Sequence, residues 1–477
     1  MKKIIAVILL LIMCLSCFAC MTGNDTTTDT DKNTDTGSNQ PSKPNGGNST
    51  YVPNYAVDTT PYKILPDATK TTFMYLNEKL DYPKITKYQN GKKAALSMTF
   101  DDANNPNAGI IVSEVFAKYG MRGTIMATVS TMKGSAGSEE ASIQAWQRVL
   151  DLGYLDLGAH GYNHADPSDL PESSYEHEIG DAFRYLRENF PSQRVLTYAT
   201  PFARITGSYE SYLKDWCITN RLETGGNFAA TGTDFNMYRI YAKMIKEGTN
   251  LLPIMDAVEA SVDAERWIVH LFHDIIEDDG SSNYNPTTRS TFEGYCRLLH
   301  TRYADTVWFG SYEEVAIYAL QYDHMTVDYT GISRNSLTFK VDCTLEDDRL
   351  YEVPVGMSVQ LPRFTNEAYA VINGETVQKL ELTKDGTKIY SVVKDVPIYD
   401  TEVQIFFSGN TTFRNGCTRH TWQFLETTEP DKYGLIADTY ACTNCECTYV
   451  NSYIHESEVE DKNENEVTNS NSGELNQ

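Results

Sequence analysis

Between residues 94 and 322, short apolar runs alternate with longer stretches in which apolar residues recur every three or four positions. The run at 94–102 is typical of a buried strand, and the stretch after it, which stops at Gly120, indicates a helix. Further strands are expected before His160 and at 123–129, 195–199 and 267–272, and further helices at 142–152 and 175–190. This order predicts a parallel α/β sheet or barrel.

Polar or site-forming residues follow four of these apolar runs directly. Asp101 and Asp102 end the first run, and His160, Phe202 and His273 each follow a different later run. In an α/β barrel the carboxyl ends of the strands meet at one rim, where active sites are built. The acid pair alone could simply cap the next helix. Four such coincidences predict one shared site.

Two histidines, His160 and His164, are four residues apart. This spacing would place both imidazoles on one side of a helical turn, aimed at one point. A histidine pair of this kind can also be a surface accident. Combined with an acid after an earlier strand, it becomes a two-histidine, one-carboxylate set, which indicates a metal site.

The order of these motifs resembles the polysaccharide deacetylase (NodB homology) family, carbohydrate esterase family 4. The likeness spans roughly residues 96–322, about half of the chain. It implies a distorted (β/α) barrel and metal-dependent removal of N-acetyl groups, or alternatively O-acetyl groups, from a polysaccharide. The motifs are Thr99-Phe100-Asp101-Asp102, His160-Gly161-Tyr162-Asn163-His164, Thr200-Pro201-Phe202 and Leu271-Phe272-His273-Asp274.

The resemblance also implies a metal set. Asp102, His160 and His164 would hold a divalent ion, expected to be Zn²⁺, with Co²⁺ or Ni²⁺ as alternatives. Three protein ligands would leave a coordination position open, as a catalytic site requires.

Catalytic roles follow from the same resemblance. Asp101 would be the general base, His273 the general acid, and the backbone N–H of Phe202 would stabilise the oxyanion. Strand alternation places His273 on the face of Leu271 and turns His270 to the other face. His270 is therefore expected to be a core histidine.

The sequence departs from the family in two motifs. In the third motif, Phe202 replaces the usual Tyr and Ala203 replaces the usual Gly. Ala199 stands where the family carries an Arg that orients the base, and Arg204 is close enough in sequence to substitute. No fourth motif is recognisable between residues 207 and 264, so the acid that would pair with His273 is unassigned. Both departures put activity in doubt, but not metal binding.

The N-terminus carries the pattern of a secretory signal in residues 1–20. An apolar run at 4–15 follows a charged start and precedes small residues with Cys17 and Cys20. A Cys after a small residue resembles the lipobox of bacterial lipoproteins, with either cysteine as the lipidated residue. The expected location is the extracellular face of the bacterial cytoplasmic membrane, held by a lipid anchor, with plain secretion as the alternative. Residues 21–50 are polar and indicate a disordered linker.

Domain boundaries follow from changes in pattern. The deacetylase domain is expected at 51–325, and residues 326–410, with alternating β-type stretches and Asn-Gly and Asp-Gly turns, predict a small immunoglobulin-like β-sandwich. Residues 456–477 are acidic and polar and indicate a disordered tail.

Residues 411–455 are expected to form a small Cys-rich module. Cys417 and His420 form a C-x2-H pair, and Cys442 and Cys445 form a C-x2-C pair. These four residues could close a zinc ribbon. Disulfide pairing is the alternative, because export favours it.

Charge narrows the function classes further. The chain has 65 acidic and 40 basic residues and a net charge of −25, which argues against a nucleic-acid partner because phosphates are bound through Lys and Arg. Two classes remain: a metal-dependent deacetylase of an acetylated polysaccharide, and an inactive deacetylase-fold surface protein that binds carbohydrate. The complete metal set favours the first, and the missing Arg and fourth motif favour the second.

Overall fold

Every residue described below belongs to the part of the chain from Asn54 to Gln477. The expected signal, linker and acidic tail lie outside the described residues. No helix of the described part is long and apolar enough to cross a membrane. The computed structural model describes residues 71–75, 78–223, 236–282, 284–332, 336–345, 352–409, 422–429, 435–442 and 448–454.

Seven parallel strands of the described chain close into a barrel, which confirms the predicted fold class. Each strand pairs with the next, and the last pairs back onto the first, with Trp267 opposite Ala95 and Phe272 opposite Phe100. A short strand, β13 (Val307–Trp308), pairs with the start of the first. The barrel strands are β4 (Ala94–Asp102), β5 (Gly123–Ala127), β6 (Leu155–Ala159), β7 (Thr197–Ala199), β8 (Thr219–Glu223), β9 (Ile240–Met244) and β10 (Trp267–Phe272).

Strand β4 shows why the barrel forms. All nine of its residues are buried, and Leu96, Met98 and Phe100 belong to the apolar core that also contains residues of the outer helices. The alternate residues Ser97 and Thr99 are also buried, and their hydroxyls donate to the backbone oxygens of Ser311 and His270. Since side chains alternate along a strand, Asp101 continues the row of Ser97 and Thr99.

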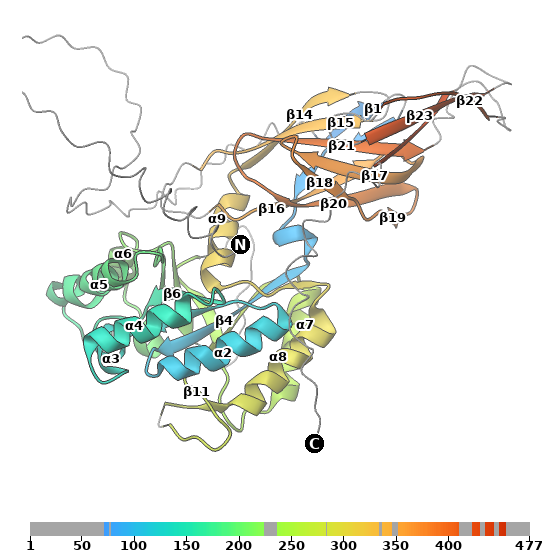
Figure 1. Ribbon diagram of the computed structural model, residues 1–477. Coiled ribbons are helices and arrows are strands. Elements are labelled where there is room, and N and C mark those ends of the chain that lie inside the picture. Colours follow the sequence, from blue (N-terminus) through green and yellow to red (C-terminus); the bar gives the residue numbers. More distant parts are fainter. Residues whose placement is uncertain are drawn as a thin grey trace, which may run out of the picture. The chain divides into compact units, whose positions relative to one another are not determined.

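Helices connect and cover the strands (Figure 1). Helix α2 begins after Asn105, whose side chain accepts from the Asn107 N–H, and ends at Gly120 with φ 61°. Asn105 is thus the cap, and the alternative in which Asp101 or Asp102 caps this helix is wrong. The helices are α2 (Pro106–Tyr119), α3 (Val129–Gly134), α4 (Glu139–Leu150), α5 (Ala182–Asn189), α6 (Gly207–Leu213), α7 (Leu251–Asp263), α8 (Arg289–Tyr303) and α9 (Tyr312–Tyr322).

The described residues from Met325 on form only β-strands, as predicted, and these strands belong to two sheets. One contains β14 (Met325–Ile332), β15 (Ser336–Cys343), β17 (Thr365–Ile372), β18 (Thr376–Lys379), β21 (Thr401–Gly409), β22 (Trp422–Thr427), β23 (Leu435–Cys442) and β24 (Thr448–Ile454). The other contains β3 (Lys84–Ile85), β16 (Val355–Leu361), β19 (Thr383–Asp385) and β20 (Lys388–Val396). Two further pairs are β1 (Thr72–Tyr75) with β2 (Glu78–Asp81), and β11 (Ile275–Ile276) with β12 (Thr287–Thr288).

The expected Cys-rich module is largely outside the description. Cys417, His420 and Cys445 are not among the described residues, and Cys442 is the last residue of β23. The choice between a zinc ribbon and disulfides therefore stays a prediction.

Candidate metal centre and active site

Asp102, His160 and His164 come together at the carboxyl ends of β4 and β6, and one ligand atom from each lies within 4.8 Å of the others. Asp102 Oδ1 is 3.8 Å from His160 Nε2 and 3.8 Å from His164 Nε2. Ligands of a tetrahedral Zn²⁺, with bonds of about 2.0 Å, stand roughly 3.3 Å apart. Small side-chain shifts would therefore close this set on one ion.

His160 is oriented for such a role by the neighbouring strand. Its Nδ1 lies 2.7 Å from the backbone oxygen of Ala199, so this nitrogen carries the proton and donates it. The other nitrogen, Nε2, then presents its lone pair to Asp102 and His164. Burial lowers the pKa of His160, and this favours the neutral form that a metal requires. The donor set fits a divalent metal ion.

The segment from His160 to His164 is a bent loop, so the expected helical turn is wrong. Gly161 has φ 84° and His164 has φ 59°, both in the left-handed region. These two reversals replace the helical turn and bring the rings to a centroid distance of 4.7 Å. The four-residue spacing of the two histidines thus indicated their proximity, but a bent loop rather than a helical turn produces it.

Asp101 occupies a different environment from its neighbour. It is 6% exposed, and Nη2 of Arg221 lies 2.6 Å from both of its carboxylate oxygens. Burial acts to raise the pKa of Asp101, but Arg221, with His160 and His273, outweighs burial and holds the pKa below its usual value. Asp101 is therefore an ionised carboxylate, able to accept a proton.

Arg221 is the residue that sequence reasoning missed. It lies on β8, directly opposite Ala199 of β7 in the parallel register. The family resemblance implies an Arg at position 199; here the Arg that contacts Asp101 comes from the adjacent strand. Arg204, the substitute suggested by the sequence, is exposed and pairs with Asp166 at 2.6 Å instead. A register prediction for β7 and β8 would have been needed to find Arg221.

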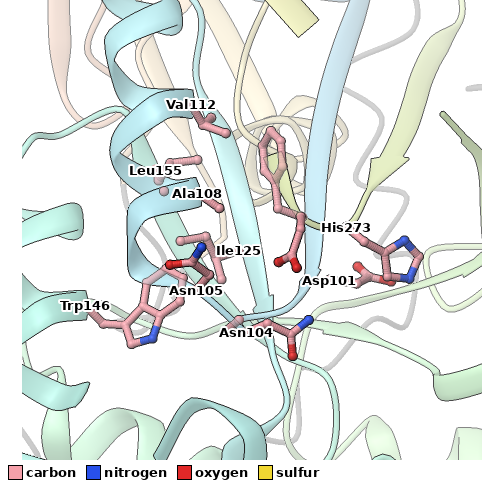
Figure 2. A pocket seen from close by; sticks show the side chains of 13 residues that line it. Asp101, Asn104, Asn105, Ala108, Val112, Ile125, Trp146, Leu155 and His273 are labelled. Carbon is pink, nitrogen blue, oxygen red and sulfur yellow. The ribbon is translucent and has the colours of Figure 1, made fainter. Parts of the chain in front are cut away.

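His273 follows β10 and lines one cavity together with Asp101, Asn104 and Asp274. Figure 2 shows Asp101 and His273 on one side of this cavity and apolar residues of α2, such as Val112, on the other. Within the described residues the buried His273 Nδ1 has no hydrogen-bond partner. The acid expected to pair with His273 is not found there.

Phe202 lies in the short turn η4 (Pro201–Ala203) after β7. Its ring is 57% exposed and meets the ring of His164 edge to face, with centroids 4.7 Å apart. Phe202 and Ala203 both have φ 56°, a strained conformation for residues with a Cβ. This turn places the Phe202 ring against His164.

The remaining histidines near the barrel lie apart from this set. His270 is fully buried, its Nδ1 is 2.6 Å from the Tyr295 hydroxyl, and burial lowers its pKa to about 3. This confirms the expected core role. His177 pairs with Asp181, and His300 contacts a backbone oxygen, both at the surface.

Residues 88–220 match the family model described as "Polysaccharide deacetylase". The chain is also 22% identical over 334 residues to gellan lyase from Bacillus sp, which covers 66% of this chain and 13% of that protein. It therefore spans only a small part of that relative's length.

Solved structures of low identity are similar to the barrel part. A mutant of the peptidoglycan deacetylase PdaC from Bacillus subtilis is 14% identical with a TM-score of 0.33, over 48% of this chain and 93% of that chain. A CE4 family pseudoenzyme from Bacillus anthracis is 12% identical with a TM-score of 0.34, over 48% of this chain and 66% of that chain. Because these scores are low, the likeness to the family rests on the sequence match alone. The match over residues 88–220 includes Asp101, Asp102, His160 and His164, so this part of the chain is similar to the polysaccharide deacetylase family.

Proposed function

We propose that this protein is a metal-dependent hydrolase that removes N-acetyl groups, or alternatively O-acetyl groups, from a cell-surface or extracellular polysaccharide. The observation that carries the proposal is the pairing of a buried, ionised Asp101 with the adjacent set of Asp102, His160 and His164. A base beside a metal set is the combination that metal-assisted hydrolysis requires.

In this proposal Asp102 Oδ1, His160 Nε2 and His164 Nε2 hold the ion. A bound divalent ion, Zn²⁺ first and Co²⁺ or Ni²⁺ as alternatives, supplies Lewis-acid chemistry for hydrolysis of the acetyl group. The hydrogen bond from His160 to Ala199 fixes the ring so that Nε2 faces the site.

The protein groups then divide the proton transfers. Asp101 takes a proton from a water molecule while the oxygen of that water bonds to the acetyl carbonyl carbon. The backbone N–H of Phe202 donates a hydrogen bond to the carbonyl oxygen as negative charge develops there. His273 donates a proton to the leaving nitrogen as the carbon–nitrogen bond breaks, which yields acetate and a free amine. Asp101 and His273 both line one cavity, whose lining residues do not include Asp102, His160 or His164.

A second candidate is a catalytically inactive surface protein that binds carbohydrate. The specific observation in its favour is His273, whose buried Nδ1 lacks a partner in the described chain. Without a partner acid, the imidazole is poorly fixed as a proton donor.

Acetate release separates the two candidates. Wild-type protein, loaded with zinc, cobalt or nickel, is incubated with N-acetylglucosamine oligomers and with O-acetylated xylan, and chelated protein is the control. Metal-dependent acetate release from the first polymer supports the N-deacetylase, and release from the second alone supports the esterase. Binding to a polymer with no acetate release would favour the inactive candidate.

A further inference from the structure

We propose that Glu178 is a positioning residue that holds the His160–His164 loop in its metal-binding shape. The inference rests on the proposed metal centre and adds to it a residue that contacts no substrate. Glu178 lies on η3 (Glu176–Asp181), a π-helical turn that precedes α5, and is 2% exposed. Such turns often occur at functional sites because the extra residue re-aims a side chain.

Glu178 binds the loop on both sides of His164. Its carboxylate accepts hydrogen bonds from the Asn163 N–H, at 3.2 and 3.1 Å to the two oxygens, and from the Ala165 N–H at 2.9 Å. Its backbone oxygen accepts from the Tyr162 N–H at 2.9 Å. One residue therefore fixes three amides within the loop and directly after it.

The loop closes tightly over this carboxylate. A Cβ placed on Gly161 would lie 2.5 Å from Glu178 Oε1, closer than real Cβ contacts allow. Gly161 also has φ 84°, which strains any residue with a side chain. The glycine thus lets the loop backbone approach the carboxylate.

These contacts also hold the backbone conformation of His164. His164 has a left-handed φ of 59°, a strained conformation that persists only where the surroundings enforce it. The amides on either side of His164 are those that Glu178 holds. Without them the loop can relax, and Nε2 of His164 leaves the position 3.8 Å from Asp102 Oδ1.

A carboxylate suits this task better than an amide of the same size. Both oxygens of Glu178 face N–H donors, and a glutamine would present one NH₂ group to them instead. Glu178→Gln should therefore weaken metal affinity by about 10- to 100-fold, the usual effect of losing a group that orients a ligand. Glu176→Gln is the matched control, because Glu176 lies on the same turn but binds Arg184 and Tyr212 rather than the loop.

The test is competition for Zn²⁺ between full-length protein and a chromophoric chelator. The His160→Ala variant serves as the background control, because it measures how much zinc binds elsewhere in the chain. Weaker binding in Glu178→Gln, with wild-type binding in Glu176→Gln, supports the inference. Equal affinity in wild type and Glu178→Gln would overturn it and leave the proposed deacetylase intact.

Two further outcomes are informative. If Glu178→Gln does not fold, Gly161→Ala decides, because it disturbs the same contact from the loop side: unchanged affinity there overturns the inference. If the wild type binds no more zinc than His160→Ala, the metal centre is wrong, and this inference falls with it. Acetate release enters none of these measurements, so an inactive protein could still confirm the role of Glu178.

Discussion

Asp101 and Asp102 are adjacent in the chain but have different surroundings. Asp101 lies on the side of β4 that faces Arg221, and Asp102, at φ 75°, turns toward the two histidines. Sequence analysis separated the two acids only through the family resemblance. The structure gives the separation a physical basis. Both carboxylates lie near His160 Nε2, at 3.6 Å for Asp101 and 3.8 Å for Asp102, but Asp101 is paired with the Arg221 guanidinium, and Asp102 lies 3.8 Å from His164.

The two acids should therefore fail differently when each is changed to Asn. Asp102→Asn should weaken metal retention, because an amide oxygen is a poorer ligand than a carboxylate. Asp101→Asn should keep the metal and lower turnover by roughly 10²- to 10⁴-fold, the typical value of a positioned base. Metal analysis and acetate kinetics on both variants check this. A metal-replete Asp101→Asn protein with near wild-type turnover would remove Asp101 from the mechanism.

Arg221 gives a second prediction at the residue scale. Arg221→Met leaves a buried carboxylate unpaired, so the free energy of unfolding should fall by about 3–5 kcal/mol, and turnover should fall as well. The double variant Ala199→Arg, Arg221→Ala moves the guanidinium to the opposite strand position. It should restore part of the stability and part of the turnover, because residues 199 and 221 are in register. Urea unfolding and acetate release measure the effects, with Arg204→Ala as control. If neither stability nor turnover recovers in the double variant, an Arg on β7 cannot replace Arg221 on β8, contrary to the prediction.

At the scale of elements, apolar runs predicted the strands that are buried on both faces. Strands β4 and β10 have the predicted bounds because nearly continuous burial requires nearly continuous small or apolar residues. Strand β8 begins with Thr219, Asn220 and Arg221, all buried polar residues, and so carried no apolar signal. Arg221, the ion-pair partner of Asp101, could not be predicted from the sequence for that reason.

Two buried carboxyl groups from different elements provide a pH prediction. Asp156 of β6 and Glu313 of α9 have pKa values raised to about 7 and about 8, chiefly by burial. The charge of Asp156 raises the pKa of Glu313, and the charge of Glu314 raises the pKa of both groups. Arg122 lowers the pKa of Asp156, and Arg194 lowers the pKa of Glu313. A carboxyl pKa raised by folding stabilises the protein fully below its unfolded value, near 4, and the effect is lost as pH rises through the folded value.

Stability should thus decline between about pH 4 and pH 8, by up to about 1.4 kcal/mol per pH unit for each extra proton that the folded state binds. Urea unfolding at pH 5 and pH 8 measures this loss. Asp156→Asn and Glu313→Gln should each reduce the difference. Glu293→Gln, in a surface pair with Lys118, should not. An unchanged pH dependence in both core variants would contradict the assignment.

At the scale of the whole molecule, residues from before the barrel take part in the C-terminal sheets. Strand β3 pairs with β16, with Lys84 opposite Ser358 and Ile85 opposite Met357. The Thr86 hydroxyl adds a hydrogen bond to the backbone oxygen of Gly356 at 3.2 Å. Pairings of such long sequence separation leave no local pattern, so sequence analysis predicted strands after residue 326 but not this partner.

Anchoring is the remaining prediction at this scale. The signal pattern with Cys17 and Cys20 predicts a lipid-anchored protein, with the polar linker between anchor and barrel. A Cys17→Ser, Cys20→Ser double variant should leave the membrane fraction on cell fractionation. Each single variant then identifies the lipidated cysteine. A double variant retained as fully as wild type would mean that another feature holds the protein there.

The central claim is that the two-histidine, one-carboxylate set supports hydrolysis, and a zinc titration tests it most directly. Metal-free protein is titrated with Zn²⁺ while acetate release from N-acetylglucosamine oligomers is followed, with His160→Ala and His164→Ala alongside. The account predicts that acetate release rises with occupancy of a site that both variants lack, and that neither variant gains activity. Full occupancy of that site without acetate release, or release that persists in both variants, would contradict it.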